Sequence, residues 1–99
     1  MKRMVSVLLV LSICSAHAAR QEDKPITTAS ELRDWCAEKS RLAFSARGKT
    51  PYNWSATYWD DANNLYVKGS WRVDNTEVQV QCRISRGTES RFGEMSILE

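Results

Sequence analysis

The feature that most constrains this chain is a change in the spacing of its apolar residues at Gly48. Before this glycine, apolar residues recur with the 3.6-residue period of an amphipathic helix. After Pro51 they recur at every second residue, which is the period of half-buried antiparallel strands. The order of one helix followed by strands predicts an α+β domain, in which an N-terminal helix packs on one face of a sheet.

The helix has recognisable ends. Thr28-Ala29-Ser30-Glu31 matches a capping box, and Gly48 suits the residue after the last turn, so we expect a helix from Thr28 to about Arg47. Lys39 lies on the apolar stripe, either with a lowered pKa that permits chemistry or with its ammonium reaching water at the sheet edge. We expect Ala37 and Phe44 to point away from the stripe, whose predicted members are Leu32, Trp35, Cys36, Lys39, Leu42, Ala43 and Ala46.

Four segments after Pro51 read as the strands of an antiparallel meander. Three alternate clearly, over 52–59, 65–73 and 77–84, and a weaker one covers roughly Phe92 to Leu98. The predicted inner residues are Tyr52, Trp54, Ala56, Tyr58, Leu65, Val67, Gly69, Trp71, Val73, Val78, Val80, Cys82, Ile84, Met95 and Ile97.

The two loops between the clear strands fix the predicted register. A four-residue loop over 61–64 and a two-residue turn at 74–75 keep apolar residues on one face. The resulting pairs are Trp54 with Trp71, Ala56 with Gly69, Tyr58 with Val67, Trp71 with Val78, and Val67 with Cys82. The row Ala56–Gly69–Val80 has small side chains, so we expect the helix to cross closest to the sheet there.

The first 18 residues resemble a secretory signal peptide. A basic start precedes an apolar run of 11 residues from Met4 to Cys14, and small residues follow at Ala16 and Ala18. This run is too short to span a bilayer, which needs roughly 20 apolar residues. The alternative is a buried N-terminal helix. The interpretation predicts an exported protein, located in the periplasm or outside the cell, that does not span a membrane.

Removal of this segment leaves two of the three cysteines, Cys36 and Cys82. An even number in a small exported domain predicts a disulfide, here between the helix and the third strand. The chain-entropy model assigns such a loop roughly 4 kcal/mol of stability. Two buried free thiols are the alternative. If the pair is oxidised, neither sulfur can act as a nucleophile.

Charge and composition exclude several function classes. Lys2 and Arg3 leave with the signal, so 12 of the 14 basic residues remain beside 12 acidic ones. This neutral balance gives no reason to expect a nucleic-acid partner. His17, the single histidine, also lies in the signal. Without histidine or a Gly-rich phosphate loop, we expect neither an enzyme nor a bound metal or cofactor.

The outer face of the sheet holds the candidate partner-binding residues. The register places Trp59 opposite Tyr66, Tyr66 opposite Arg83, and Arg72 opposite Glu77. An exposed Trp–Tyr pair beside an arginine can stack on a sugar or on side chains of a partner. Ordinary cross-strand stabilisation explains the same pair, and so does a bulge that turns Trp59 inward.

Two neighbouring carboxylates, Asp60 and Asp61, suit acid–base chemistry or calcium binding. The sequence Asp-Asp-Ala-Asn-Asn is also typical of a hairpin loop, because Asp and Asn tolerate left-handed backbone conformations. We favour the loop interpretation. A hydrolase that uses either aspartate is a functional hypothesis that ranks third, after the binding module and the structural envelope protein described next.

The sequence thus predicts a signal peptide over 1–18, a flexible lead-in over 19–27 and one α+β domain over 28–99, linked internally by the disulfide. The leading functional hypothesis is a non-enzymatic exported binding module, inhibitor- or immunity-like, that contacts a protein or glycan of the cell envelope. We expect a monomer or a weak dimer. The alternative is a structural or accessory envelope protein without a discrete ligand.

Overall fold

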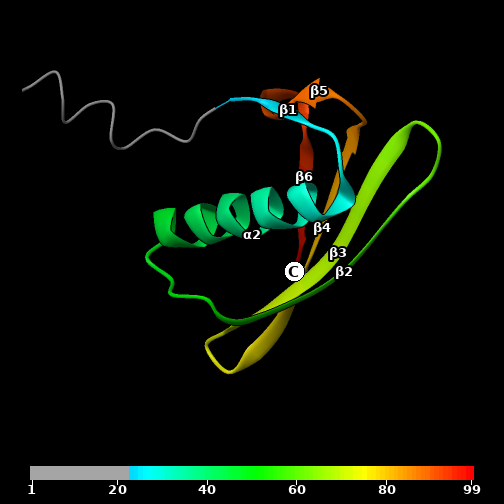
Figure 1. Ribbon diagram of the computed structural model, residues 1–99. Helices are drawn as coiled ribbons and strands as arrows, with labels where there is room; N and C mark the ends of the chain where they lie inside the picture. Colours follow the sequence, from blue (N-terminus) through cyan, green and yellow to red (C-terminus); the bar gives the residue numbers. More distant parts are fainter. Residues whose placement is uncertain (1–22) are drawn as a thin grey trace, which may run out of the picture.

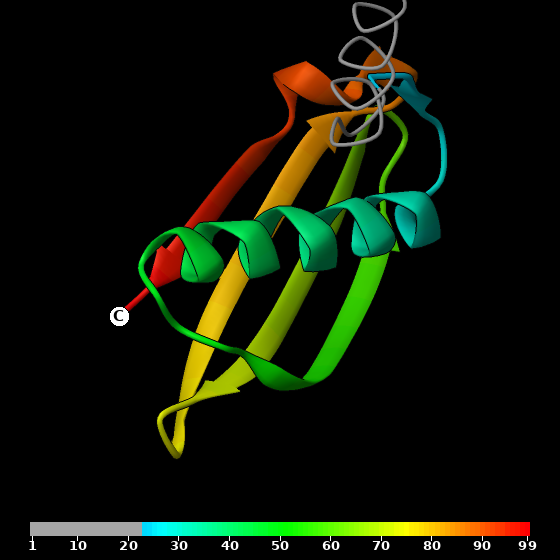
Figure 2. The ribbon, with the colours of Figure 1, turned by 90° about the vertical axis from the view of Figure 1, so that its left-hand side faces the viewer.

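The computed structural model describes residues 23–99, so the predicted signal peptide, with Cys14 and His17, lies outside the described residues. Helix α2 lies across one face of a four-stranded antiparallel sheet of strand order β2-β3-β4-β6, and no helix from residues 23–99 covers the other face (Figures 1 and 2). This arrangement confirms the predicted α+β class. The elements in chain order are β1 (Pro25–Ile26), α2 (Ala29–Ala46), β2 (Tyr52–Asp60), β3 (Asn64–Val73), β4 (Thr76–Ser85), β5 (Thr88–Glu89), a 3-10 helix (Ser90–Phe92) and β6 (Glu94–Leu98).

The predicted ends of the helix are confirmed. Thr28 Oγ1 accepts a hydrogen bond from the Glu31 backbone N–H, and Glu31 Oε1 accepts one from the Thr28 backbone N–H, which completes the capping box. At the other end, Arg47 caps the helix and Gly48 adopts a φ of 75°. This left-handed conformation is the one that favours glycine after a helix.

The predicted buried stripe was partly wrong. The buried helix residues are Leu32, Cys36, Ser40 and Phe44, so Phe44 is in the core and Leu42 is 43% exposed. These four residues are spaced by four, and such a row drifts around the helix axis. Because the helix crosses the strands at a steep angle (Figure 2), this inclined row faces the sheet rather than a stripe parallel to the axis.

The register agrees with the prediction from Ser55 onward. Ala56 pairs with Gly69, Tyr58 with Val67, and Val67 with Cys82. Both residues of the Asp74-Asn75 turn have positive φ, 52° and 64°, which these residue types tolerate. The fourth strand is β6, where Met95 and Ile97 pair with Cys82 and Val80.

One end of β2 departs from the prediction. The ladder with β3 shifts between Tyr52 and Ser55, and Asn53 has a φ of 57°. This irregularity pairs Tyr52 with Arg72, and since directly paired residues share a face, Tyr52 lies on the outer face and not the inner one. Trp54 still reaches Trp71, with ring centroids 4.9 Å apart.

The disulfide between Cys36 and Cys82 is present, with Cα atoms 6.0 Å apart. It joins the middle of α2 to β4, as predicted. The residue that covers the row Ala56–Gly69–Val80 at Gly69 differs from the prediction. A Cβ atom on Gly69 would overlap the Trp54 ring, so the indole of Trp54 covers this glycine, whereas we expected the helix to do so.

The described part of the predicted flexible lead-in belongs to the folded unit. β1 pairs with β5, and Ile26 is buried at 4% exposure. The Asp23 carboxylate accepts hydrogen bonds from Ser90 Oγ and from the Arg91 backbone N–H, both at 2.9 Å. Local sequence patterns did not predict these contacts, because the partners of residues 23–26 lie more than 60 residues later in the chain.

Candidate functional site

The outer sheet face presents a stacked aromatic pair close to the loop end of β2. Trp59 and Tyr66 are direct cross-strand partners, as predicted, with ring centroids 5.5 Å apart and planes inclined by 16°. No bulge turns Trp59 inward, and the residue is 48% exposed. The pair therefore offers a flat aromatic surface to solvent.

The hairpin loop fixes the position of Tyr66. Its hydroxyl donates a hydrogen bond to Asp61 Oδ2 at 3.1 Å. Asp61 Oδ1 accepts backbone N–H bonds from Asn64 and Asn63 at 2.8 and 3.0 Å. These bonds, that from Asn64 first, lower the pKa of Asp61, and the bond from Tyr66 raises the pKa of the phenol. The ring of Tyr66 is thus held by an ionised carboxylate that the loop itself positions.

The same cross-strand row continues with charged residues. Arg83 pairs with Tyr66 as predicted, and its guanidinium forms an ion pair with Glu94 on β6 at 2.9 Å. Glu94 lies on β6, the strand whose apolar alternation in the sequence is the least clear. Beside this row lies an open groove of about 390 Å³, lined in part by Trp59, Tyr66, Lys68, Gln81, Arg83 and Glu94.

We call the surface formed by the following six residues the Trp59 platform: Trp59, Tyr66, Lys68, Gln81, Arg83 and Glu94. Arg72, the remaining predicted binding residue, is not part of it. Arg72 pairs with Glu77 on the outer face and donates a hydrogen bond to the Asn75 carbonyl oxygen at 2.8 Å. It lies six residues from Tyr66 along β3, about 20 Å at 3.3 Å per residue.

The carboxylates considered for catalysis support the hairpin. Asp60 Oδ2 accepts a hydrogen bond from Arg86 Nη2 at 2.6 Å, and the same nitrogen donates to the Asp61 carbonyl oxygen at 3.0 Å. Arg86 Nη1 also donates to the Thr27 carbonyl oxygen at 3.1 Å. Sequence reasoning missed this arginine, because its acceptors come from two segments far from it in the chain.

Lys39 is exposed, and its Nζ lies 5.9 Å from the centre of the Trp35 ring. The ammonium therefore lies beside an aromatic ring at the surface. This position agrees with the interpretation in which the ammonium of Lys39 reaches water. In the part of the chain that the structure describes, no group of three His, Cys, Asp or Glu side chains could hold a metal ion. No described helix is both long and apolar enough to cross a bilayer.

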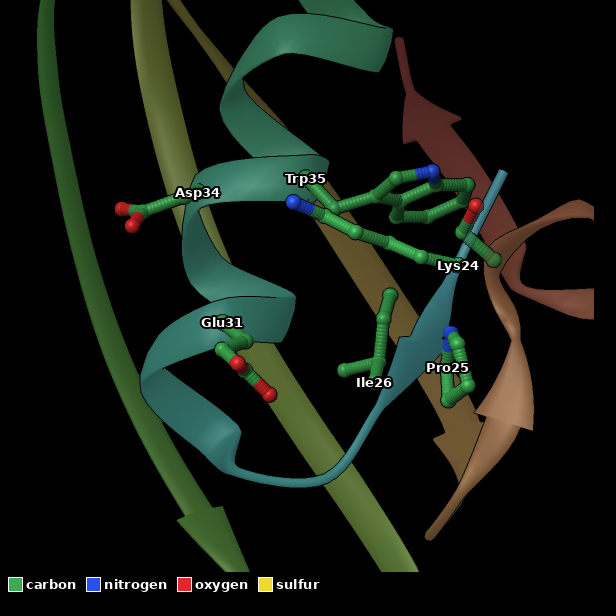
Figure 3. A pocket seen from close by; sticks show the side chains of 7 residues that line it. Lys24, Pro25, Ile26, Glu31, Asp34 and Trp35 are labelled. Atoms are coloured by element: carbon green, nitrogen blue, oxygen red, sulfur yellow. The ribbon is translucent and has the colours of Figure 1, made fainter. Parts of the chain in front are cut away.

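A second hollow, of about 330 Å³, lies between the first turns of α2 and β1 (Figure 3). Ile26 and Trp35 line it, the Lys24 side chain extends alongside the Trp35 ring, and Asp34 points away from that ring. Glu31, on its rim, is engaged in the capping box, and the backbone N–H of Thr27 is the main cause of its lowered pKa. Among the polar residues of the lining, Glu31 therefore helps to hold the segment that precedes the helix.

No known protein-family model matches the chain, and neither a curated protein nor a solved structure matches it significantly.

Proposed function

We propose that the protein is an exported, non-enzymatic binding module that recognises a protein or a glycan of the cell envelope through the Trp59 platform. The observation that carries the proposal is the stacked Trp59–Tyr66 pair, in which the indole stays 48% exposed while the tyrosine is fixed by Asp61. An aromatic ring that is already ordered loses little conformational entropy on binding, which favours affinity.

The chemistry around the pair suits such recognition. A flat indole face can stack on a sugar ring or on an apolar side chain of a protein. The platform adds an amide at Gln81, an ammonium at Lys68 and the Arg83–Glu94 ion pair. These groups offer hydrogen-bond donors and acceptors next to the stacking surface, which gives orientation and specificity.

Two further observations support an exported, non-catalytic role. The Cys36–Cys82 disulfide is consistent with an oxidising compartment, in agreement with the predicted signal peptide. Asp60 and Asp61, the aspartates considered for hydrolysis, are engaged with Arg86 and Tyr66. Their hydrogen bonds support a structural role for both carboxylates.

Capture experiments on a solubilised envelope fraction and on isolated cell-wall glycan test the proposal. We expect Trp59→Ala to reduce capture by roughly 30-fold, the size of an interface hot spot. The matched control is Phe92→Ala, which removes an aromatic ring that is 58% exposed on the 3-10 helix and should leave capture unchanged.

The free energy of unfolding, measured on the same variants, separates binding from stability. Loss of the Trp59 ring should cost about 1 kcal/mol or less, the value of a cross-strand pair. If Trp59→Ala and Tyr66→Ala both leave capture at the wild-type level, the platform only stabilises the sheet, and a structural envelope role replaces the proposal.

A further inference from the structure

From Ser55 onward, the edge of the sheet formed by β2 lacks the features that normally prevent strands from pairing between molecules. Within residues 23–99, β2 is a terminal strand of nine residues. It has no lysine or proline, which proteins place on edges to block pairing, and its one charge is Asp60 at the end. Of the six large hydrophobic residues that are exposed in the described part of the chain, three lie on this strand: Tyr52, Tyr58 and Trp59.

The hydrogen-bond pattern shows which backbone groups face outward. The Asp61 N–H donates to the Asn64 carbonyl oxygen at 3.0 Å, and bonding positions alternate along an antiparallel pair. Trp59, Thr57 and Ser55 therefore bond to β3. Ala56, Tyr58 and Asp60 direct their N–H and C=O groups away from it, toward the open edge.

The side chains of this edge complement a second copy of the same strand. The regular ladder begins at Ser55, after the irregularity, and the segment Ser55-Ala56-Thr57-Tyr58-Trp59 has two small residues before Thr57 and two large ones after it. In an antiparallel pairing centred on Thr57, the small Ala56 faces Tyr58 of the other copy. Likewise, Ser55 faces Trp59, so each large residue meets a small one.

The outward-facing backbone groups fit the same alignment. Ala56 and Tyr58, whose backbone groups are directed outward, lie opposite each other, so their N–H and C=O groups can bond between copies. The alignment also separates the charges, because Asp60 lies opposite Trp54 of the other copy. The two Asp60 carboxylates are then six residues, or about 20 Å, apart along the strands.

A groove on the inner face provides room for the second copy. It has a volume of about 470 Å³, lies between α2 and β2, and includes Ala37, Ala56 and Arg33 in its lining. In the centred alignment, Tyr58 of the second copy lies across from Ala56, at this groove. Arg33 already contacts Tyr58 of its own chain, with Cζ 5.0 Å from the ring centre.

From these observations we propose that two copies of the chain pair through their β2 edges, antiparallel and centred on Thr57, to form a continuous eight-stranded sheet. The two-fold axis stands perpendicular to the sheet, so both Trp59 platforms lie on the same outer face. The two Trp59 residues are offset by about 13 Å along the strands, four residues at 3.3 Å each. The dimer thus displays two platforms to one extended ligand, although the pairing itself does not depend on what the platform binds.

Sedimentation velocity of the oxidised protein over a range of concentrations tests the pairing. The wild type should show a reversible monomer–dimer equilibrium. Thr57→Glu places two carboxylates face to face in the dimer and should lower the association constant at least about tenfold. Within one chain the new carboxylate lies opposite Lys68, so folding is not penalised. Gln79→Glu adds the same charge to the outer face of β4 and should leave the dimer intact.

Cross-linking tests the alignment. Thr57 bonds to β3, so in the dimer the two Thr57 residues form a non-hydrogen-bonded pair with Cα atoms about 4.5 Å apart, a distance that a disulfide can span. Thr57→Cys should therefore give a covalent dimer under mild oxidation, whereas Gln79→Cys should not. A wild type that stays monomeric, together with an absent Thr57→Cys dimer, would overturn the proposal.

Discussion

The indole N–H of Trp71 donates a hydrogen bond to Ser40 Oγ at 2.9 Å in the buried interface between the sheet and α2. The serine hydroxyl in turn donates to the Cys36 carbonyl oxygen one turn earlier, at 2.6 Å. Ser40 is fully buried and Trp71 is 8% exposed. This chain of two bonds satisfies both polar groups in the core, next to the cysteine that carries the disulfide.

Ser40→Ala should destabilise the domain by about 1–3 kcal/mol, because the buried indole N–H loses its acceptor. Urea unfolding gives this free energy directly. Ser45→Ala, at an exposed position of the same helix, is the matched control and should change stability by less than about 0.5 kcal/mol. If the two variants unfold alike, the Trp71–Ser40 bond contributes nothing.

Gly69→Ala should destabilise the domain by about 1–3 kcal/mol, since the added methyl group overlaps the Trp54 ring. Thermal or urea unfolding checks the value. The double variant Gly69→Ala/Trp54→Leu supplies the control, because a smaller side chain makes room for the methyl. In that background the additional cost of Gly69→Ala should fall toward zero, and an unchanged cost would contradict the proposed overlap.

Reduction of the Cys36–Cys82 disulfide should lower the free energy of unfolding by roughly 4 kcal/mol, because the bond closes a long loop in the unfolded chain. Unfolding in urea with and without a reductant measures the difference. Alkylation of the reduced thiols keeps the bond from re-forming. A reduced protein as stable as the oxidised one would show that α2 and the sheet are held by packing alone.

Acid should destabilise the domain in part through Glu31. Hydrogen bonds from Thr27 and Thr28 hold the pKa of its carboxyl below the ordinary 4.5, so the folded state binds fewer protons than the unfolded chain. The stabilisation is complete above pH 4.5 and is lost as the pH falls through the lowered value of the folded state. Glu31→Gln should therefore flatten the acid limb of stability against pH, as followed by urea midpoints.

Glu77→Gln is the control for this experiment, because Glu77 is an exposed residue of β4 and takes no part in the capping box. Its profile should follow that of the wild type. Equal flattening by both substitutions would show that general charge, and not the capping box, governs the acid response. Asp23 and Asp61, whose pKa values are also lowered, should preserve part of the acid sensitivity in Glu31→Gln.

Local patterns were sufficient to predict much of the fold and of the candidate site. The capping box at Thr28, the turn at Asp74-Asn75 and the period-two alternation each depend on neighbouring residues, so the sequence alone predicts them. The Trp59–Tyr66 pair follows from the same register, because a hairpin loop of known length aligns its strands. The number of cysteines allowed a single pairing once the signal peptide was set aside.

Only the tertiary structure decided features that depend on the angle between elements or on residues distant in the chain. Because α2 crosses the strands at a steep angle, Phe44 is buried and Leu42 is exposed. Because the β2 ladder is irregular at Asn53, Tyr52 lies on the outer face. Likewise, the contacts of Asp23 and Arg86 join segments that no local pattern connects. The physical reason is that hydrophobic periodicity determines which face of an element is apolar, whereas packing in three dimensions determines what each face meets.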